Sequence, residues 1–246
     1  MICAGNWKMN MSPAQAEAFA RQLVAEVPVT AKDKFVLLPP ALLAGTLATE
    51  LKGSGIAWGG QNCYCELKGA FTGENSPQLL AEMGAQYCLV GHSERRHVFG
   101  ESDELLAKKV AALQKMSVTP ILCVGETLED RRANRTQEVI EGQLGAGLRG
   151  ADSSRPLWIA YEPVWAIGTG LVATPQQVEE AHSILRRVLV SWNAACSVTP
   201  ILYGGSVKSD NVASLSSLNN VNGFLIGGAS LDVREFLRIF QNSAIG

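Results

Sequence analysis

The chain has 246 residues and a formal net charge of −2 at pH 7, with 47% hydrophobic and 18% charged residues. This composition is typical of a globular protein that buries a sizeable core, and the length fits one large α/β barrel. The even balance of charge argues against a nucleic acid or an anionic membrane as the partner, because binding to either requires a concentrated basic surface.

Other broad features indicate a cytoplasmic protein that does not enter a membrane. Residues 1–8 lack the charged and apolar regions of a secretory signal. The longest apolar stretch, residues 35–45, is broken by two prolines and is too short to span a bilayer. We expect the six cysteines as free thiols, because a chain of this length does not depend on a disulfide framework. Neither the cysteines nor the three histidines have metal-site spacing, so we expect no metal.

Short apolar runs recur along the whole chain, separated by longer amphipathic segments. The runs are continuously apolar and do not alternate with polar residues, which is typical of strands buried on both faces of a parallel sheet. We expect strands at residues 2–4, 35–38, 56–58, 87–90, 119–124, 157–161, 199–203 and 223–226.

Clear start signals mark several of the intervening helices. Ser12 and Thr174 are each followed by proline, and Gln15 and Gln177 complete a capping box in each case. A further helix is expected after Ser102.

The predicted elements favour a single-domain (β/α)8 barrel over residues 1–246, because each predicted strand is followed by a helix and no linker interrupts the series. A doubly wound open sheet stays possible at this point, since periodicity does not reveal whether the sheet closes.

Polar residues gather just after the predicted strands. In a barrel, the carboxyl ends of the strands form one face, and the loops there build the active site. We therefore expect a common site from Asn6, Lys8, Asn62, His92, Glu94, Glu126, Glu162 and Ser206.

Glu162 is the candidate base. It closes the sixth predicted strand, and Pro163 keeps it out of the helical conformation. Ile159, Trp165 and Ile167 could exclude water from its carboxylate, which suits a general base. The alternative is a solvated carboxylate at a strand end.

His92 and Lys8 are weaker candidates when they are taken alone. His92 follows Gly91 at the end of the fourth strand, where a buried structural histidine is the alternative. Lys8 follows the first strand and is either a surface lysine or a cation for an anionic substrate.

Two glycine-rich segments suit a phosphate. Gly204-Gly205-Ser206 and Gly227-Gly228 follow the last two predicted strands, and we expect both to lead into helices. Glycines there let backbone N–H groups approach a phosphate at a helix N-terminus. Plain turns are the alternative.

Two other enzyme classes are disfavoured. Residues 145–150 and 168–173 match dinucleotide-binding glycine patterns, but neither lies between a strand and a helix as that site requires. Val207-Lys208 follows Ser206, so the serine lacks the nucleophile elbow of a hydrolase.

Four motifs in this order resemble the triosephosphate isomerase family. They are Asn6-Trp7-Lys8-Met9-Asn10 and the segments at residues 91–96, 160–170 and 203–207. The resemblance spans nearly the whole chain and implies a cofactor-free enzyme of glycolysis and gluconeogenesis. It would interconvert dihydroxyacetone phosphate and D-glyceraldehyde 3-phosphate.

The resemblance also implies roles for individual residues. Glu162 would move the carbon-bound proton through an enediolate intermediate, and His92 would act as a neutral electrophile and proton shuttle. Asn6 and Lys8 would stabilise the developing anion, with Glu94 holding Lys8.

The phosphate would be held by backbone amides around Gly168, Ser206, Gly227 and Gly228. Residues 163–173 would close over it as a lid, since the intermediate must be protected from loss of its phosphate. Leu171-Val172 departs from the Lys-Thr of many relatives.

Residues 63–76 resemble the family's dimer loop, which implies a homodimer. A loop of this length without helix or strand signals is usually functional. By the resemblance, the loop tip would dock beside the partner's Lys8 and Met9. Thr72 would lie near the partner's catalytic groups, and Glu74 would lie near the partner's Arg95.

Two competing functions stay open on the sequence alone. A Schiff-base aldolase on the same barrel needs a lysine inside a strand, whereas Lys8 lies past its strand. A scaffold without activity could have lost Glu162, His92 or Lys8, and all three are present.

Overall fold

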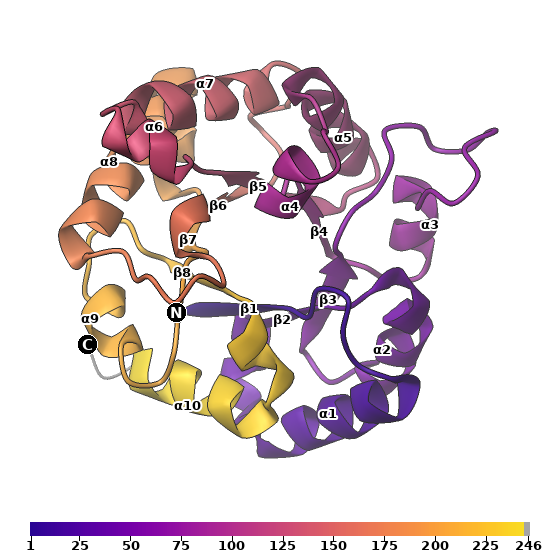
Figure 1. The fold of residues 1–246 in the computed structure, drawn as a ribbon. Helices are drawn as coiled ribbons and strands as arrows, with labels where there is room; N and C mark the ends of the chain where they lie inside the picture. Colours follow the sequence, from indigo (N-terminus) through magenta and orange to yellow (C-terminus); the bar gives the residue numbers. More distant parts are fainter. Residues whose placement is uncertain (244–246) are drawn as a thin grey trace.

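The computed structural model describes residues 1–243. Eight parallel strands pair in chain order and β8 pairs with β1, so the sheet closes into a barrel (Figure 1). This closure confirms the predicted (β/α)8 barrel and excludes the open sheet. The strands are β1 (Ile2–Asn6), β2 (Phe35–Leu38), β3 (Ala57–Gly60), β4 (Tyr87–Val90), β5 (Thr119–Val124), β6 (Trp158–Tyr161), β7 (Ile201–Tyr203) and β8 (Gly223–Ile226).

The strands follow the predicted apolar runs closely. The bounds of β2, β4, β5 and β8 are those expected from the sequence. β1 continues to Asn6 and β3 continues to Gly60, because these residues still pair with Leu38 and Cys88 on the next strand. β7 begins later than expected, since Thr199 closes a short 3-10 helix before it.

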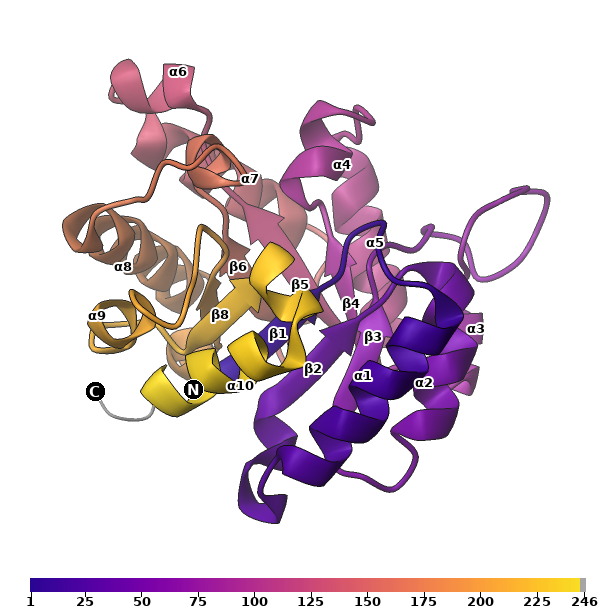
Figure 2. The same cartoon turned by 60° about the horizontal axis from the view of Figure 1, so that its bottom comes forward.

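Helices surround the barrel (Figures 1 and 2). The capping boxes expected at Ser12 and Thr174 are both present, and Ser102 caps α5 by accepting a bond from the Leu105 N–H. The α-helices are α1 (Pro13–Glu26), α2 (Ala44–Glu50), α3 (Pro77–Glu82), α4 (Ser93–His97), α5 (Asp103–Lys115), α6 (Leu128–Arg132), α7 (Thr136–Leu148), α8 (Pro175–Trp192), α9 (Val212–Ser216) and α10 (Val233–Ser243). The 3-10 helices are η1 (Val29–Lys34), η2 (Ala41–Leu43), η3 (Val164–Ala166), η4 (Ala194–Val198) and η5 (Gly228–Leu231).

The core has two layers because successive strand residues point to opposite faces of the sheet. Val36 and Leu89 belong to the cluster that fills the barrel interior, which is packed and is not a pore. Leu37 and Val90 belong to the larger cluster between the barrel and the helices. Both faces of the strands are therefore buried, which explains the continuous apolar runs.

One connection departs from the compact outline. Residues 61–76, between β3 and α3, contain no helix or strand and reach away from the barrel (Figure 2). Within residues 1–243, no helix combines the length and the apolar character needed to cross a bilayer.

Candidate active site

A pocket of about 270 Å³ opens where the carboxyl ends of the strands meet. Residues that follow β1, β4, β6, β7 and β8 contribute to its wall. The pocket therefore has the position that a barrel enzyme requires. Site residues expected from the sequence line it, namely Asn6, Lys8, His92, Glu162, Gly168, Gly204, Gly205, Ser206, Gly227 and Gly228.

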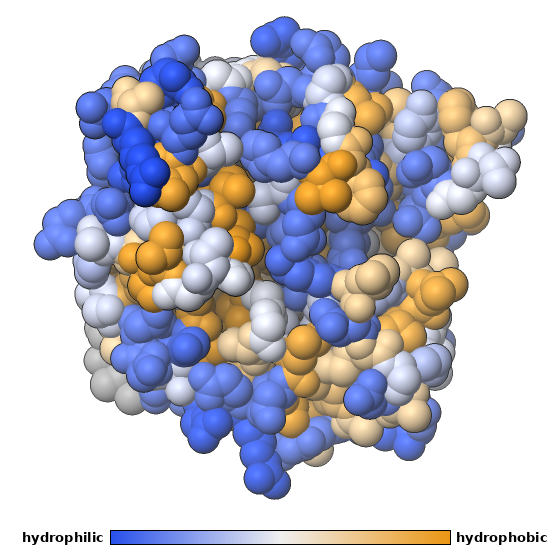
Figure 3. Space-filling view, in the orientation of Figure 1, coloured by the Kyte–Doolittle hydropathy of each residue, from blue (hydrophilic) through white to orange (hydrophobic). Residues whose placement is uncertain are grey.

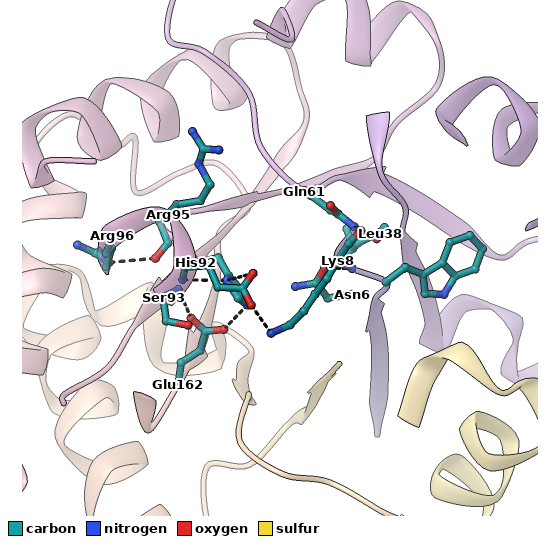
Figure 4. A network of polar contacts seen from close by, with 12 residues as sticks. Asn6, Lys8, Leu38, Gln61, His92, Ser93, Arg95, Arg96 and Glu162 are labelled. Atoms are coloured by element: carbon teal, nitrogen blue, oxygen red, sulfur yellow. Dashed lines mark hydrogen bonds and ion pairs between the residues drawn. The ribbon is translucent and has the colours of Figure 1, made fainter. Parts of the chain in front are cut away.

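Glu162 and His92 point toward each other in this pocket (Figure 4). The His92 Nε2 lies 3.0 Å from Oε1 of Glu162. The other carboxylate oxygen of Glu162 accepts a hydrogen bond of 2.8 Å from the backbone N–H of Ser93. Both Glu162 and His92 are buried, with relative exposures of 2% and 5%. The carboxylate is thus removed from bulk water and is not the solvated strand-end group that the sequence left open.

The hydrogen bonds of His92 indicate its tautomer. His92 is the N-cap residue of α4, and its Nδ1 accepts a bond of 3.2 Å from the backbone N–H of Glu94. An accepting Nδ1 carries no proton, so the proton of a neutral ring is on Nε2. Nε2 is the nitrogen that faces Glu162 and the pocket, where it can donate to an oxygen of a substrate.

Lys8 has a strained backbone, and contacts with three neighbours hold it at the pocket. Its backbone φ is 51°, a left-handed conformation that is costly for a residue with a side chain. The Lys8 N–H donates to Oδ1 of Asn6 at 3.0 Å, and Gln61 donates to the Lys8 carbonyl at 2.9 Å (Figure 4). The Lys8 ammonium lies 2.6 Å from Oε1 of Glu94, the pair that the resemblance implies.

A close approach between the ends of two neighbouring strands fixes the position of the Glu162 backbone. Gly125 follows β5, and a side-chain carbon at this position would lie 1.7 Å from the Glu162 carbonyl oxygen. Gln143 of α7 accepts from the Gly125 N–H at 2.8 Å and donates to the Gly125 carbonyl at 3.2 Å. The two strand ends therefore meet in a contact that only glycine allows.

Glu126 does not belong to the pocket, contrary to the expectation of one common site. Its side chain is fully buried behind β6, and Trp165 donates to its Oε1 at 2.9 Å. Arg131 and the Tyr161 hydroxyl also contact this carboxylate. Burial and the nearby Glu126 carboxylate raise the pKa of Tyr161. Since Trp165 lies in residues 163–173, Glu126 anchors the start of the predicted lid.

Asn62 is also turned away from the pocket. Its Oδ1 accepts a bond of 2.8 Å from the buried ammonium of Lys109. The same ammonium lies 2.7 Å from Glu101, which also pairs with Arg95 at 2.6 Å. The prediction that Asn62 belongs to the common site is therefore wrong, because its side chain accepts a hydrogen bond from Lys109, a buried lysine of α5.

The two glycine-rich segments differ in their surroundings. Gly228 begins the 3-10 helix η5, so this segment leads directly into a helical turn as expected. Ser206 does not, because the next helix, α9, begins only at Val212. Instead, the Ser206 hydroxyl donates to the carbonyl of Ala166 at 3.0 Å and so connects this segment to residues 163–173.

Several residues that shape the site were not found from the sequence. Gln61, the Ser93 N–H and Gln143 all act through polar contacts across the barrel, and no local motif marks such contacts. In the described part of the chain, no group of three or more His, Cys, Asp or Glu side chains is arranged to hold a metal ion. All six cysteines carry free thiols.

Comparison with known proteins gives a consistent result. A family model described as triosephosphate isomerase matches residues 1–243. A protein of Bdellovibrio bacteriovorus named triosephosphate isomerase is 48% identical over 238 residues, which cover 97% of this chain and 98% of the relative. Proteins of the same name from Nitrosococcus oceani and Aquifex aeolicus are each 43% identical. Their alignments cover 98% and 97% of this chain, respectively, and 97% of each relative.

Proposed function

This chain belongs to the triosephosphate isomerase family, and we propose that it interconverts dihydroxyacetone phosphate and D-glyceraldehyde 3-phosphate. The observation that carries the proposal is the distance of 3.0 Å between His92 and Glu162 in a pocket at the carboxyl ends of the strands. A carbon acid beside a carbonyl needs a base for the C–H proton and a donor for the oxygen. Glu162 can act as this base and His92 as this donor, and the two side chains lie within hydrogen-bonding distance of each other.

The proton transfers follow from this pair. Glu162 removes a proton from the carbon beside the carbonyl, and the electron pair moves to the carbonyl oxygen to form an enediolate. The His92 Nε2–H donates to this oxygen, and the ring carries the hydroxyl proton between the two oxygens. Glu162 then returns its proton to the neighbouring carbon, which completes the isomerisation without an oxidant or a reductant.

The charge that develops on the enediolate oxygens is met by fixed groups. Lys8 and Asn6 line the same pocket, and Glu94 holds the Lys8 ammonium at 2.6 Å. A cation and an amide donor that are already oriented stabilise a developing anion without reorganisation during the reaction. We assign Asn6, Lys8, His92, Glu94 and Glu162 to the catalytic machinery on this basis.

The phosphate binds at the other end of the pocket in this proposal. Gly168, Ser206, Gly227 and Gly228 line that end, and the glycines leave their backbone N–H groups accessible to an anion.

Residues 163–173 act as a lid over the bound phosphate. Trp165 attaches the start of the lid to Glu126, and the Ser206 hydroxyl donates to the carbonyl of Ala166, the next residue of the lid. Leu171 and Val172 at its far end are about half exposed, at 49% and 52%. Crystals grown with and without a phosphate-bearing analogue should differ in the position of this lid. An identical, well-ordered lid in both, free of lattice contacts, would contradict closure.

We also propose that the active form is a homodimer built through residues 63–76. The pocket of about 340 Å³ at the base of this loop is lined by Glu74, Leu79, Met83 and Arg95, and it could receive the loop tip of a partner. Hydrophobic side chains are exposed on the same side of the molecule (Figure 3). Exposed hydrophobic residues in the segments around this loop include Met9, Leu42, Leu79, Met83, Val98 and Phe99.

A contact between two aromatic side chains of the same loop shapes the loop tip. The Phe71 ring packs against Tyr64 of the same loop, with 4.5 Å between ring centroids. Phe71 therefore stiffens the loop, while Thr72 and Glu74 are left exposed for a partner.

The proposed activity is tested by a coupled assay of the purified protein with D-glyceraldehyde 3-phosphate, with nothing else added to the isomerisation step. Formation of dihydroxyacetone phosphate is the expected result. In deuterated water, one carbon-bound deuterium should enter the product, because Glu162 exchanges its proton with solvent. No isomerisation in this assay would reject the proposal, as would isomerisation that left the His92→Gln and Glu162→Gln variants fully active.

A further inference from the structure

Three charged side chains line the pocket, and their charges decide whether an anionic substrate is attracted to it. They are Lys8, Glu162 and Lys208. The Lys8 ammonium is already paired with Glu94 at 2.6 Å, and Glu162 adds a buried negative charge. Without Lys208, these side chains would present a net negative charge to an incoming phosphate dianion, and only backbone N–H groups would attract it.

Lys208 is an exposed residue at the phosphate end of this pocket, beside Ser206 and Gly228. Among residues 1–243, no carboxylate forms an ion pair with the Lys208 ammonium. Asp210 lies two residues further along and is also exposed, but it does not pair with Lys208.

The backbone that carries Lys208 is held firmly. Asn211 accepts from the Lys208 N–H at 2.9 Å and donates to the Ser206 carbonyl at 3.1 Å. Ser209 is attached to α10, because its N–H donates to Glu235 at 2.9 Å and its carbonyl accepts from Asn242 at 2.7 Å.

Glu235 does not cancel the lysine charge. It pairs with Arg238 at 2.9 Å, and the hydrogen bond from the Ser209 N–H helps to lower the pKa of Glu235. The carboxylate thus stays ionised as an anchor, with its charge balanced by a cation on α10. The segment 206–211 is therefore preorganised, and it presents one unpaired cation at the pocket rim.

We propose that Lys208 attracts the phosphate dianion of the substrate into the pocket and so selects for phosphorylated over neutral trioses. This role rests on the proposed isomerase function, but it involves no proton transfer. A charge at the rim acts over distance on the encounter with substrate, so it changes kcat/KM and leaves kcat unchanged.

The expected size follows from Coulomb's law. For a unit charge roughly 10 Å from a dianion in water, the attraction raises the encounter rate about fourfold. Lys208→Ala should lose about this factor at low ionic strength, and Lys208→Glu should lose roughly the square of it, since it reverses the charge. At about 1 M salt the screening length is roughly 3 Å, so the difference should disappear.

The matched control is Lys115, at the end of α5 on the opposite side of the barrel. Lys115 is exposed and makes no ion pair with the described residues, so Lys115→Ala and Lys115→Glu change the net charge by the same amount. Each variant is assayed with D-glyceraldehyde 3-phosphate and with neutral D-glyceraldehyde at low and high salt. Binding of inorganic phosphate is measured by calorimetry as a readout that does not depend on turnover.

We expect weaker phosphate binding and lower kcat/KM for D-glyceraldehyde 3-phosphate in Lys208→Ala and Lys208→Glu, and only at low salt. The Lys115 variants should not show this loss. Lys208→Arg keeps the positive charge, so it should keep the wild-type values. Equal salt dependence of the Lys208 and Lys115 variants would overturn it. So would a loss that persists at high salt or extends to D-glyceraldehyde, because a disturbed loop would cause both. A wild-type protein without isomerase activity would reject the proposed function, and phosphate binding would still decide the role of Lys208.

Discussion

Nε2 of His92 lies 3.0 Å from Oε1 of Glu162, although these residues follow β4 and β6, which are not neighbours in the barrel. The strand between them, β5, ends at Val124 and is followed by Gly125, where the missing side chain leaves room for the Glu162 backbone. A substrate that reacts with both groups must enter between them and replace their contact. The chemistry of the site therefore depends on how three strand ends are packed together.

Replacing Glu162 with glutamine removes the proposed carbon base and keeps the shape of the side chain. Turnover should fall by roughly 10²–10⁴-fold, the usual contribution of a general base. Steady-state kinetics gives the change, and circular dichroism checks that the fold is retained. Glu138→Gln, the same substitution at an exposed position on α7, should leave turnover unchanged. Near-normal turnover in Glu162→Gln would remove the assignment.

His92 should be a neutral ring with its proton on Nε2 in the free enzyme at pH 7, since Nδ1 accepts from the Glu94 N–H. Nitrogen NMR distinguishes this tautomer from the imidazolium ion. The His92 signals are identified by their absence from the spectrum of His92→Gln, while those of His97 and His182 persist. An imidazolium signal from His92 at neutral pH would contradict the proposed donor role.

Gly125→Ala should disturb both stability and catalysis, because the added carbon would lie 1.7 Å from the Glu162 carbonyl oxygen. We expect a loss of about 1–3 kcal/mol in the free energy of unfolding, as is typical of overpacking. A displacement of Glu162 by about 1 Å could lower turnover by roughly a hundredfold. Denaturant unfolding and steady-state kinetics measure the two effects.

The matched control is Gly145→Ala in α7, where an added carbon would meet no atom within 4 Å. Alanine there should stabilise the protein by about 0.5–1 kcal/mol, because glycine is a poor residue in a helix interior. If the two variants were equally stable and equally active, the close approach at Gly125 would have no functional importance.

The fold could be predicted from local patterns to a large extent. Apolar runs located the strands, and capping residues such as Ser12 and Thr174 located helix starts, because both depend on neighbours in the sequence. Closure of the sheet is different, since it depends on β8 pairing with β1 from the far end of the chain.

The same distinction explains which site residues were found. Position at a strand end brought Asn6, Lys8, His92 and Glu162 into the pocket. The same reasoning gave a wrong prediction for Asn62 and Glu126, because a strand end fixes the position of the backbone and not the direction of the side chain. Both side chains turn to satisfy buried groups, Lys109 for one and Trp165 for the other.

His182 should make the protein sensitive to acid. The side chain is fully buried on α8, its Nδ1 lies 3.0 Å from the Asn220 carbonyl, and burial lowers the pKa to about 4. The unfolded chain binds a proton near the ordinary pKa of 6.5, so between pH 6.5 and 4 it holds more protons than the folded protein. The free energy of unfolding therefore falls as the pH is lowered through this window, by roughly 3 kcal/mol from this residue alone.

Urea unfolding at pH 7, 5.5 and 4.5 measures this dependence. His182→Gln keeps a donor for the Asn220 carbonyl and cannot be protonated, so its stability should fall less steeply than that of the wild type. His97→Gln changes an exposed histidine and should keep the wild-type slope. If the free energy of unfolding changed equally with pH in all three proteins, His182 would not contribute to the loss of stability in acid.

Thr72→Arg should both dissociate the proposed dimer and lower turnover. Thr72 is exposed at the tip of the loop 63–76, and Phe71 packs on Tyr64 so that the tip keeps its shape. A long cation there would not enter a closely packed pocket on a partner. A stable interface buries about 1,200–2,000 Å² in total, so a single long cation at its centre is costly. The side chains of Met9, Val98 and Phe99, in segments around the loop, are exposed in the single chain.

The loss of turnover follows from the position of Lys8. Its strained backbone is held by contacts of Asn6 and Gln61, while the neighbouring Met9 is 94% exposed in the single chain. A partner that covers Met9 would fix the segment from outside, and small displacements of a catalytic group are costly. Sedimentation velocity and kinetics at the same protein concentration test both effects, with Thr30→Arg in the exposed 3-10 helix η1 as the control. A wild-type protein that sedimented as a monomer with full activity would contradict the dimer and its catalytic role, because Lys8 would then be held in position by its own chain alone.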